Sequence, residues 1–249
     1  MRTSSFVLLL LLVAGTGTAA APQVSAADRD RARTHNRLGW EALRAEKYEQ
    51  AIKSFQEAID IRRDYEYAHY GLGRTYLAMR RYADAVTVLE KCKDLYLAQG
   101  SRQFTNVQEA TRFREDRVVE IDEQIRLLRS GPQTVQTQDL VRQYETTKRD
   151  LQENIRRSQG MTIDATVPGW VSLSLGSAYF RSGRLKDAEG AYVEALKSDA
   201  RLGEAHNNLA VVYLETGRIR EALASLESAK KAGVKVNPEL EKAIRSRKQ

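Results

Sequence analysis

Residues Ala205–Arg218 read AHNNLAVVYLETGR, a run in which apolar residues recur at helical spacing before a Gly-Arg break. Its Leu209-Ala210 dipeptide has a counterpart in Leu175-Gly176, 34 residues earlier. The same step of 34 residues separates Leu72-Gly73 from Leu38-Gly39. A fixed period of this size indicates stacked copies of one small structural unit, so the sequence predicts a repeat protein.

Further marks follow each leucine in the same register. Thirteen positions after the leucine stands a small residue, which is Ala51, Ala85, Ala188 or Ala222. Four positions later comes a large apolar residue, which is Phe55, Leu89, Tyr192 or Leu226. Apolar residues keep helical spacing on both sides of a basic turn, which predicts a helix, a tight turn and a second helix. Small residues are needed where two packed helices approach within ~10 Å.

This pattern resembles the tetratricopeptide repeat family over 32–99 and 169–236. The resemblance implies an all-α fold, an α-solenoid of helix-turn-helix units. The chain departs from the family pattern in the turn, where Glu46 and Arg80 stand in place of the Gly183 and Gly217 of the later copies. Ala210 replaces the usual Gly, and the proline that often closes a unit is absent from all four copies.

In that family the first helix of each unit lines a concave groove. The resemblance therefore implies groove-facing residues, which are Asn36, Trp40, Arg44, Tyr70, Arg74, Ser174, Ser177, Asn207, Asn208 and Val211. Asparagine amides can both donate to and accept from an extended backbone, so these residues suit a peptide. The family's clamp for C-terminal carboxylates is not expected, because Trp40 and Asn36 replace its Asn and Lys.

The core of each repeat is expected at Leu38, Ala51, Phe55 and their copies. Trp40 and Tyr70 lie outside these slots, so we predict that they serve partner binding and contribute little to stability. Cys92 occupies a small-residue slot of the repeat and is expected to be buried.

The repeats form two pairs on either side of an insert. The N-terminal pair is predicted at 27–99 (repeats 32–65 and 66–99), and the C-terminal part at 169–249 (repeats 169–202 and 203–236). A capping helix is predicted over 237–249, because Asn237 is a good helix cap and Pro238 suits the first helical position. It is expected to cover the apolar end of the last repeat.

The insert, residues 100–168, does not continue the repeat marks. Helical spacing within 105–129, the break at Ser130-Gly131-Pro132 and a second amphipathic stretch predict an antiparallel hairpin of two long helices. The charges of the two helices balance, which predicts solvated outer faces. Three interpretations stay open: overgrown helices within one continuous stack, a protruding arm that contacts a partner, or a linker that lets the two pairs move.

The N-terminus, residues 1–26, has the features of a secretory signal peptide. Arg2 precedes the apolar run Phe6–Ala14, and Val24-Ser25-Ala26 resembles a cleavage site. The run is too short to span a membrane, which takes about 20 residues. The sequence therefore predicts a periplasmic or secreted protein that is soluble after cleavage and has no transmembrane anchor. No Asn-x-Ser/Thr acceptor occurs, which favours a bacterial source.

The sequence carries no recognisable catalytic or metal-binding pattern. His35, His69 and His206 each stand three residues before a repeat leucine, which predicts packing roles at positions too far apart to share a metal ion. A phosphate-binding glycine loop, a Cys/His cluster and a nucleophile elbow are all missing, so we expect no enzyme, no cofactor and no metal. The net charge is +7, but predicted export argues against nucleic-acid binding.

These features predict an exported, non-enzymatic adaptor or scaffold that binds a partner protein or peptide in its groove. The alternative is a structural subunit of a cell-envelope assembly, with the hairpin and the two ends as interfaces. The basic C-terminal region, 230–248, leaves contact with an anionic membrane surface as a further alternative.

Overall fold

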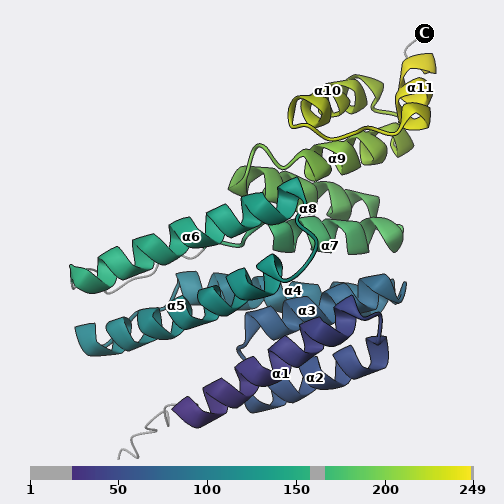
Figure 1. The fold of residues 1–249 in the computed structure, drawn as a ribbon. Helices are drawn as coiled ribbons and strands as arrows, with labels where there is room; N and C mark the ends of the chain where they lie inside the picture. The colour runs from purple at the N-terminus through teal and green to yellow at the C-terminus, as the bar shows by residue number, and fades with distance from the viewer. Residues whose placement is uncertain (1–23, 158–165, 248–249) are drawn as a thin grey trace, which may run out of the picture.

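The computed structural model describes residues 24–157 and 166–247, and within these ranges it consists of α-helices without a strand (Figure 1). The predicted signal peptide lies mainly on residues 1–23, outside the described part. The repeat helices are α1 (Ala26–Arg44), α2 (Tyr48–Ile61), α3 (Glu66–Ala78), α4 (Tyr82–Gly100), α7 (Gly169–Arg181), α8 (Leu185–Ser198), α9 (Gly203–Glu215) and α10 (Ile219–Lys231). The remaining helices are α5 (Val107–Arg129) and α6 (Val135–Arg156) of the insert, and α11 (Pro238–Ser246). The predicted all-α class is confirmed.

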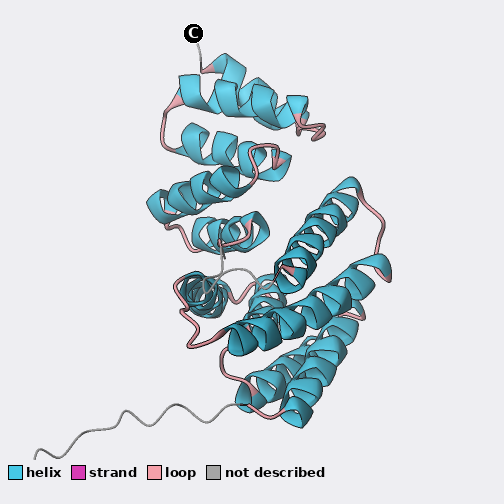
Figure 2. Cartoon of the chain, turned by 90° about the vertical axis from the view of Figure 1, so that its left-hand side faces the viewer, coloured by secondary structure: helices cyan, strands magenta, loops and turns pink. Residues whose placement is uncertain are grey.

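The four repeat units α1–α2, α3–α4, α7–α8 and α9–α10 stack one on the next (Figures 1 and 2). The two helices of the insert, α5 and α6, are called the hairpin below. Helix α4 packs against α7, as α2 packs against α3 and α8 against α9. The Tyr179 hydroxyl on α7 donates to the Glu90 carboxylate on α4 at 2.6 Å, and Lys93 pairs with Glu194 at 2.5 Å. The insert therefore interrupts the order of the repeats along the sequence but not their packing.

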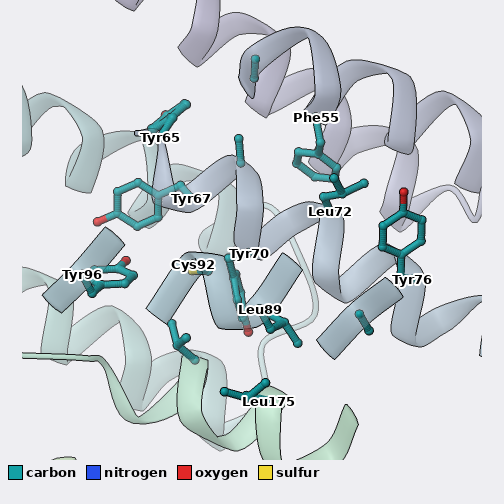
Figure 3. Packing of buried hydrophobic residues seen from close by; sticks show 14 of the residues in the cluster. Phe55, Tyr65, Tyr67, Tyr70, Leu72, Tyr76, Leu89, Cys92, Tyr96 and Leu175 are labelled. Atoms are coloured by element: carbon teal, nitrogen blue, oxygen red, sulfur yellow. The ribbon is translucent and has the colours of Figure 1, made fainter. Parts of the chain in front are cut away.

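Inside each unit the two helices approach closely at the predicted small residues. A Cβ atom placed on Gly73 would lie 2.6 Å from Cγ of Leu89, and one placed on Gly176 would lie 2.6 Å from the ring of Tyr192. The fourth unit has Ala210 at the same position, fully buried. Figure 3 shows the large side chains that fill this interior, Phe55 and Leu89 among them. A Cβ atom at Gly73 or Gly176 would force the facing side chain to shift, because the interior is close-packed.

The repeat leucine packs toward the preceding unit, and this corrects one expectation for the first repeat. Leu72, Leu175 and Leu209 are 5 %, 2 % and 3 % exposed, and Leu209 clusters with Tyr192 of the unit before it. Leu38 is 40 % exposed, because no repeat precedes the first one in the described chain. Leu38 was expected in the core, and it lies instead on the open end of the stack.

The basic residue of the turn stacks on the aromatic residue of the first helix. The guanidinium carbon lies above the ring centroid at 4.5 Å for Arg81 and Tyr76, 4.4 Å for Arg184 and Tyr179, and 4.3 Å for Arg218 and Tyr213. The first unit keeps a basic residue, Lys47, but has Ala42 in place of the tyrosine. In the other three units, the cation–π contact gives a physical reason why the two marks occur together.

The turns that depart from the family pattern keep its backbone conformation. Glu46 and Arg80 have φ angles of 58° and 60°, close to the 76° of Gly183 and the 73° of Gly217. The left-handed region is costly for residues with a Cβ atom, so the first two turns are strained and the last two are not. Backbone hydrogen bonds hold both turns, from the N–H of Lys47 to the Ala42 carbonyl and from the N–H of Arg81 to the Tyr76 carbonyl, each at 2.9 Å.

Helix α11 covers the C-terminal end of the stack, as the sequence predicts. The Asn237 side chain accepts a hydrogen bond from the backbone N–H of Glu239 at 2.9 Å, and Pro238 opens the helix. Ile244 is fully buried in a cluster with Leu214 and Leu226. The cap hides apolar surface that a fifth repeat would otherwise cover.

Candidate binding groove and the helix that covers it

Helix α5 packs against α1 in the N-terminal half of the stack (Figure 1). Both helices run in the same direction, because the contacts advance along both together. These contacts are Arg29 Nε to Asp116 at 3.2 Å, Arg37 Nε to Glu123 at 3.8 Å, and Arg44 Nη1 to the carbonyl oxygen of Leu127 at 2.8 Å. The α1 face that carries these three arginines is therefore covered by α5. The hairpin is thus folded back onto the first two repeats.

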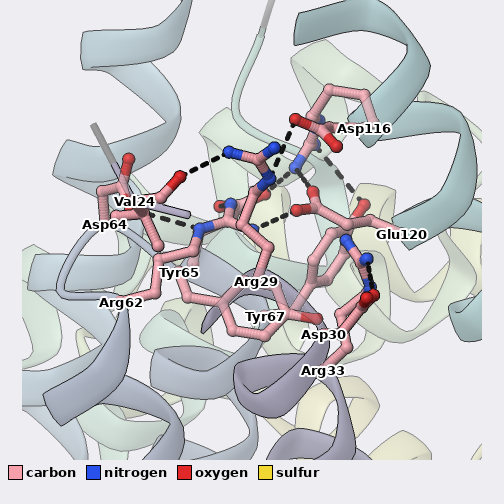
Figure 4. Close-up of polar contacts among 12 residues, drawn as sticks. Val24, Arg29, Asp30, Arg33, Arg62, Asp64, Tyr65, Tyr67, Asp116 and Glu120 are labelled. Atoms are coloured by element: carbon pink, nitrogen blue, oxygen red, sulfur yellow. Dashed lines mark hydrogen bonds and ion pairs between the residues drawn. The ribbon is translucent and has the colours of Figure 1, made fainter. Parts of the chain in front are cut away.

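Four charged side chains meet in the interior where α5 reaches the start of α3. Arg62 pairs with Glu120 (Figure 4), and Arg117 pairs with Glu66 and, at 2.8 Å, with Glu120. Glu66 is 0 % and Glu120 is 1 % exposed. Two carboxylates and two guanidinium groups balance, so the cluster adds no net charge to the interior. Removal of one member would leave a buried charge uncompensated, which is costly.

The surroundings of this cluster shift the titration of its members. Burial alone would raise the pKa of Glu120, but its ion pairs with Arg62 and Arg117 outweigh burial and hold the pKa below its usual value. Burial raises the pKa of Tyr67, which lies beside Arg117. Near neutral pH the cluster therefore combines an ionised Glu120 with a neutral Tyr67, and hairpin docking depends on the carboxylate charge.

Aromatic rings connect α6 to the middle of the solenoid. The Trp170 ring on α7 lies 4.2 Å from the ring of Tyr70 and 6.3 Å from that of Tyr144 on α6, measured between centroids. The Gln143 amide of α6 donates to Asp199, between α8 and α9, at 2.8 Å. The hairpin therefore contacts both halves of the stack, and its helices are more than overgrown repeat helices.

On α1, the predicted groove residues Asn36 and Trp40 are packed within the chain. Asn36 is fully buried and offers no surface to a partner, contrary to its predicted place in the groove. Trp40 is half-buried, and its ring lies 5.6 Å from that of Phe55 and 5.8 Å from that of Tyr70, between centroids. The expectation that Trp40 stands apart from the repeat core is wrong, because its edge packs on the core ring of Phe55.

The other three predicted residues of the N-terminal half also have partners in the chain. Arg44 donates to the Leu127 carbonyl, as described above. Tyr70 is 9 % exposed, and its hydroxyl accepts a hydrogen bond from Arg74 at 3.0 Å. Arg74 remains exposed around that contact. The N-terminal half of the predicted groove is thus largely filled by the protein itself.

The C-terminal half of the predicted groove is less covered. Ser174 is 8 % exposed and lies 3.3 Å from the Tyr70 hydroxyl. Ser177 is half-buried and accepts a hydrogen bond from the Tyr192 hydroxyl at 3.4 Å. On α9, three predicted residues are all half-buried, namely Asn207, Asn208 and Val211. Helix α9 packs against α7, α8 and α10.

Sequence reasoning missed the acidic face of α5. Asp116, Glu120 and Glu123 follow one another at steps of four and three residues, so they share one side of the helix. Balanced charge was expected to mean solvated faces, which is wrong here, since Glu123 is 9 % exposed. Two arginines of α1 match this face, since Arg29 pairs with Asp116 and Arg37 with Glu123, but only the fold brings them together.

The three histidines occupy separate places. His35 pairs with Glu57 at 2.9 Å, His69 is 7 % exposed against the Tyr65 carbonyl, and His206 lies 3.1 Å from the Ala200 carbonyl. Across residues 24–157 and 166–247, no three His, Cys, Asp or Glu side chains gather in a way that could hold a metal ion. In the same ranges, no helix combines the length and apolar character needed to cross a membrane.

Among proteins of solved structure, the chain is similar to TPR proteins. No curated protein sequence matches the chain. Similar solved structures include a thermophilic TPR protein from Thermus thermophilus (20 % identity, 87 % of this chain and 98 % of that one, TM-score 0.35). Another is YrrB, a TPR protein with an unusual peptide-binding site (16 % identity, 92 % and 100 %, TM-score 0.29). A third is the TPR2AB domain of yeast Sti1 in complex with pHSP90 (12 % identity, 88 % and 99 %, TM-score 0.30).

Sequence profiles described as Tetratricopeptide repeat match residues 42–93 and residues 173–233. These segments lie on either side of the hairpin, within α1–α4 and α7–α10. The chain therefore carries tetratricopeptide repeats in both halves of its solenoid.

Proposed function

We propose that this chain is an exported, non-enzymatic adaptor that binds an extended segment of a partner protein along α7 and α9. The observation that carries the proposal is the unequal cover of the groove. Helix α5 lies on α1 and on the start of α3, whereas α9 packs against repeat helices. The partner surface is then the C-terminal half of the groove, with Ser177, Asn207, Asn208 and Val211.

The chemistry of this half suits an extended backbone. Asn207 and Asn208 present amides that can donate to a carbonyl and accept from an N–H of the partner. Val211 lies one helical turn beyond Asn207 and adds apolar contact at the same face. Side chains that are already half-buried lose little freedom on binding, which limits the entropic cost of complex formation.

A photo-crosslinking side chain at position 208, expressed in the native host, tests this assignment. The matched control is position 220, because Arg220 is exposed on α10. We expect a defined partner crosslinked through position 208 and absent through position 220. Equal crosslinking at both positions, or none at position 208, would contradict binding along α9.

A structural subunit of a cell-envelope assembly is the second candidate, and exposed apolar side chains support it. Leu97, Val107 and Val119 are 50 %, 45 % and 44 % exposed at the end of α4 and on α5. An assembly that docks on the hairpin would cover them. The same crosslinker at position 119 separates the two candidates, since an assembly subunit crosslinks there and an adaptor does not.

Export is tested on the protein from its native host. Intact-mass measurement should show the loss of about 20–26 N-terminal residues, the range that signal peptides of this kind allow. Cleavage after Ala26 would remove Ser25, whose hydroxyl accepts a hydrogen bond from the backbone N–H of Asp28 at the start of α1. A mature protein that keeps Met1 would contradict the export part of the proposal.

A further inference from the structure

The hairpin encloses a cavity of about 640 Å³ where α5 and α6 meet the end of α4 and the start of α7. This volume lies within the ~300–1,000 Å³ of small-molecule sites. Half of the described residues that line it are aromatic or aliphatic, and these include Tyr67, Tyr96, Ile121, Tyr144, Leu151 and Trp170. The groove proposed above does not include this space.

The aromatic wall is held in place by the surrounding core. Tyr67 and Tyr96 are 2 % and 3 % exposed, with ring centroids 6.5 Å apart. Trp170 is half-buried, and its ring packs 6.0 Å from that of Tyr96. A wall whose rings are already fixed by their neighbours binds a flat apolar body without first having to be ordered.

The charged side chains among the described residues lining the cavity are all arginines. The described residues that line it include Arg117, Arg142 and Arg201, and no Asp or Glu is among them. Arg117 is neutralised by Glu66 and Glu120. The side chain of Arg201 is 90 % exposed, and its Nε lies 3.8 Å from Asp199, so its guanidinium keeps donors at the rim.

We propose that this cavity binds a small organic anion: a flat, apolar body that packs against Trp170 and an acidic group that faces Arg201. Aromatic rings prefer edge-to-face or offset contact with one another, which the exposed part of Trp170 offers. Arginine forms charge-assisted hydrogen bonds with carboxylate, sulfonate or phosphate groups. The hairpin then has two roles, because it covers the N-terminal half of the groove and also forms a wall of the ligand site.

Anilinonaphthalene sulfonate is a suitable probe, because it combines a flat apolar body with one acidic group and becomes fluorescent in an apolar site. We expect the native protein to bind a single dye per chain, with energy transfer from tryptophan to the dye. Thr147→Trp adds a bulky side chain to the α6 wall of the cavity and should abolish binding. The matched control is Asn154→Trp, also exposed on α6 but outside the cavity, which should bind as the native protein does.

Arg201→Gln tests the charge separately and removes only an exposed side chain. We expect this substitution to weaken binding of the sulfonate dye by about two- to fivefold, the effect of an exposed charge pair. It should leave the affinity for the neutral dye N-phenylnaphthylamine unchanged. Circular dichroism of each variant controls for the fold. The proposal is overturned by dye binding without a defined stoichiometry, by equal binding of the Thr147→Trp and native proteins, or by an equal effect of Arg201→Gln on both dyes.

Discussion

The guanidinium of Arg44, at the end of α1, donates a hydrogen bond of 2.8 Å to the main-chain carbonyl of Leu127, near the C-terminus of α5. The last carbonyls of a helix lack partners within the helix and carry its negative dipole end, so a cation there is favourable. A residue that the repeat pattern assigns to ligand binding thus serves the chain's own hairpin. The N-terminal half of the groove has an internal occupant.

The buried ion cluster should make hairpin docking sensitive to a single substitution. Glu120→Ala leaves the buried Arg62 and Arg117 without their shared carboxylate, and we expect the free energy of unfolding to fall by about 3–5 kcal/mol. Urea denaturation measures this loss. The matched control is Glu145→Ala, since the side chains of the Arg129–Glu145 pair are 59 % and 47 % exposed. This substitution should lower the free energy of unfolding by about 0.5 kcal/mol or less. Equal effects of the two substitutions would contradict the burial of the cluster.

The same cluster predicts a dependence of stability on acid pH. The pKa of Glu120 is lower in the folded protein than its unfolded value of about 4.3, so its stabilisation is complete above that value. It is lost as the pH falls through the folded pKa, because the unfolded chain then binds the proton more readily. Melting temperatures measured between pH 7 and pH 3 should fall less steeply for Glu120→Gln than for the native protein. Parallel curves would contradict the lowered pKa.

The strained turns predict a stabilising substitution. Arg80 has a φ angle of 60°, so Arg80→Gly should raise the free energy of unfolding by about 0.5–1 kcal/mol, even though it removes a side chain. The reverse change, Gly217→Ala, should lower it by about 1 kcal/mol, because a Cβ there meets no atom within 4 Å and only the backbone opposes it. Thermal melting of both variants checks the pair. A loss of stability in Arg80→Gly would sink this account of the turn.

Trp40 should matter for stability, in contrast to the prediction from the repeat pattern. Its ring packs on Phe55 and Tyr70, so Trp40→Ala should lower the free energy of unfolding by about 3 kcal/mol. The control is Arg220→Ala on α10, an exposed site where a change of about 0.5 kcal/mol or less is expected. An unchanged urea midpoint for Trp40→Ala would contradict a packing role for Trp40 and support its predicted place in the groove.

The repeats could be predicted from the sequence because their packing is local and periodic. Gly73 opposite Leu89 and Gly176 opposite Tyr192 are the same contact in two units, and one register finds both. The cap at Asn237 follows from helix-end chemistry in the same way. The exposure of Leu38 also follows from position, since the first unit of a stack has no predecessor.

The hairpin placement could not be predicted, because it rests on contacts between distant parts of the chain. Nothing local to Glu120 distinguishes it from a solvated helix carboxylate, and its partner Arg62 lies 58 positions earlier. The contact of Arg44 with the Leu127 carbonyl follows from that placement. For the groove residues of the N-terminal half, the repeat register could therefore not predict whether they face a partner or the chain's own hairpin.

A double-mutant cycle between Arg62 and Glu120 tests the central claim, that the hairpin docks on the first two repeats, most directly. The free energies of unfolding of the native protein, Arg62→Gln, Glu120→Gln and the double variant are compared by urea denaturation. If α5 lies where the buried pair places it, the two substitutions should couple by about 1 kcal/mol or more. Effects that add within about 0.3–0.5 kcal/mol would mean that the two residues do not meet, and the account of a covered groove would be wrong.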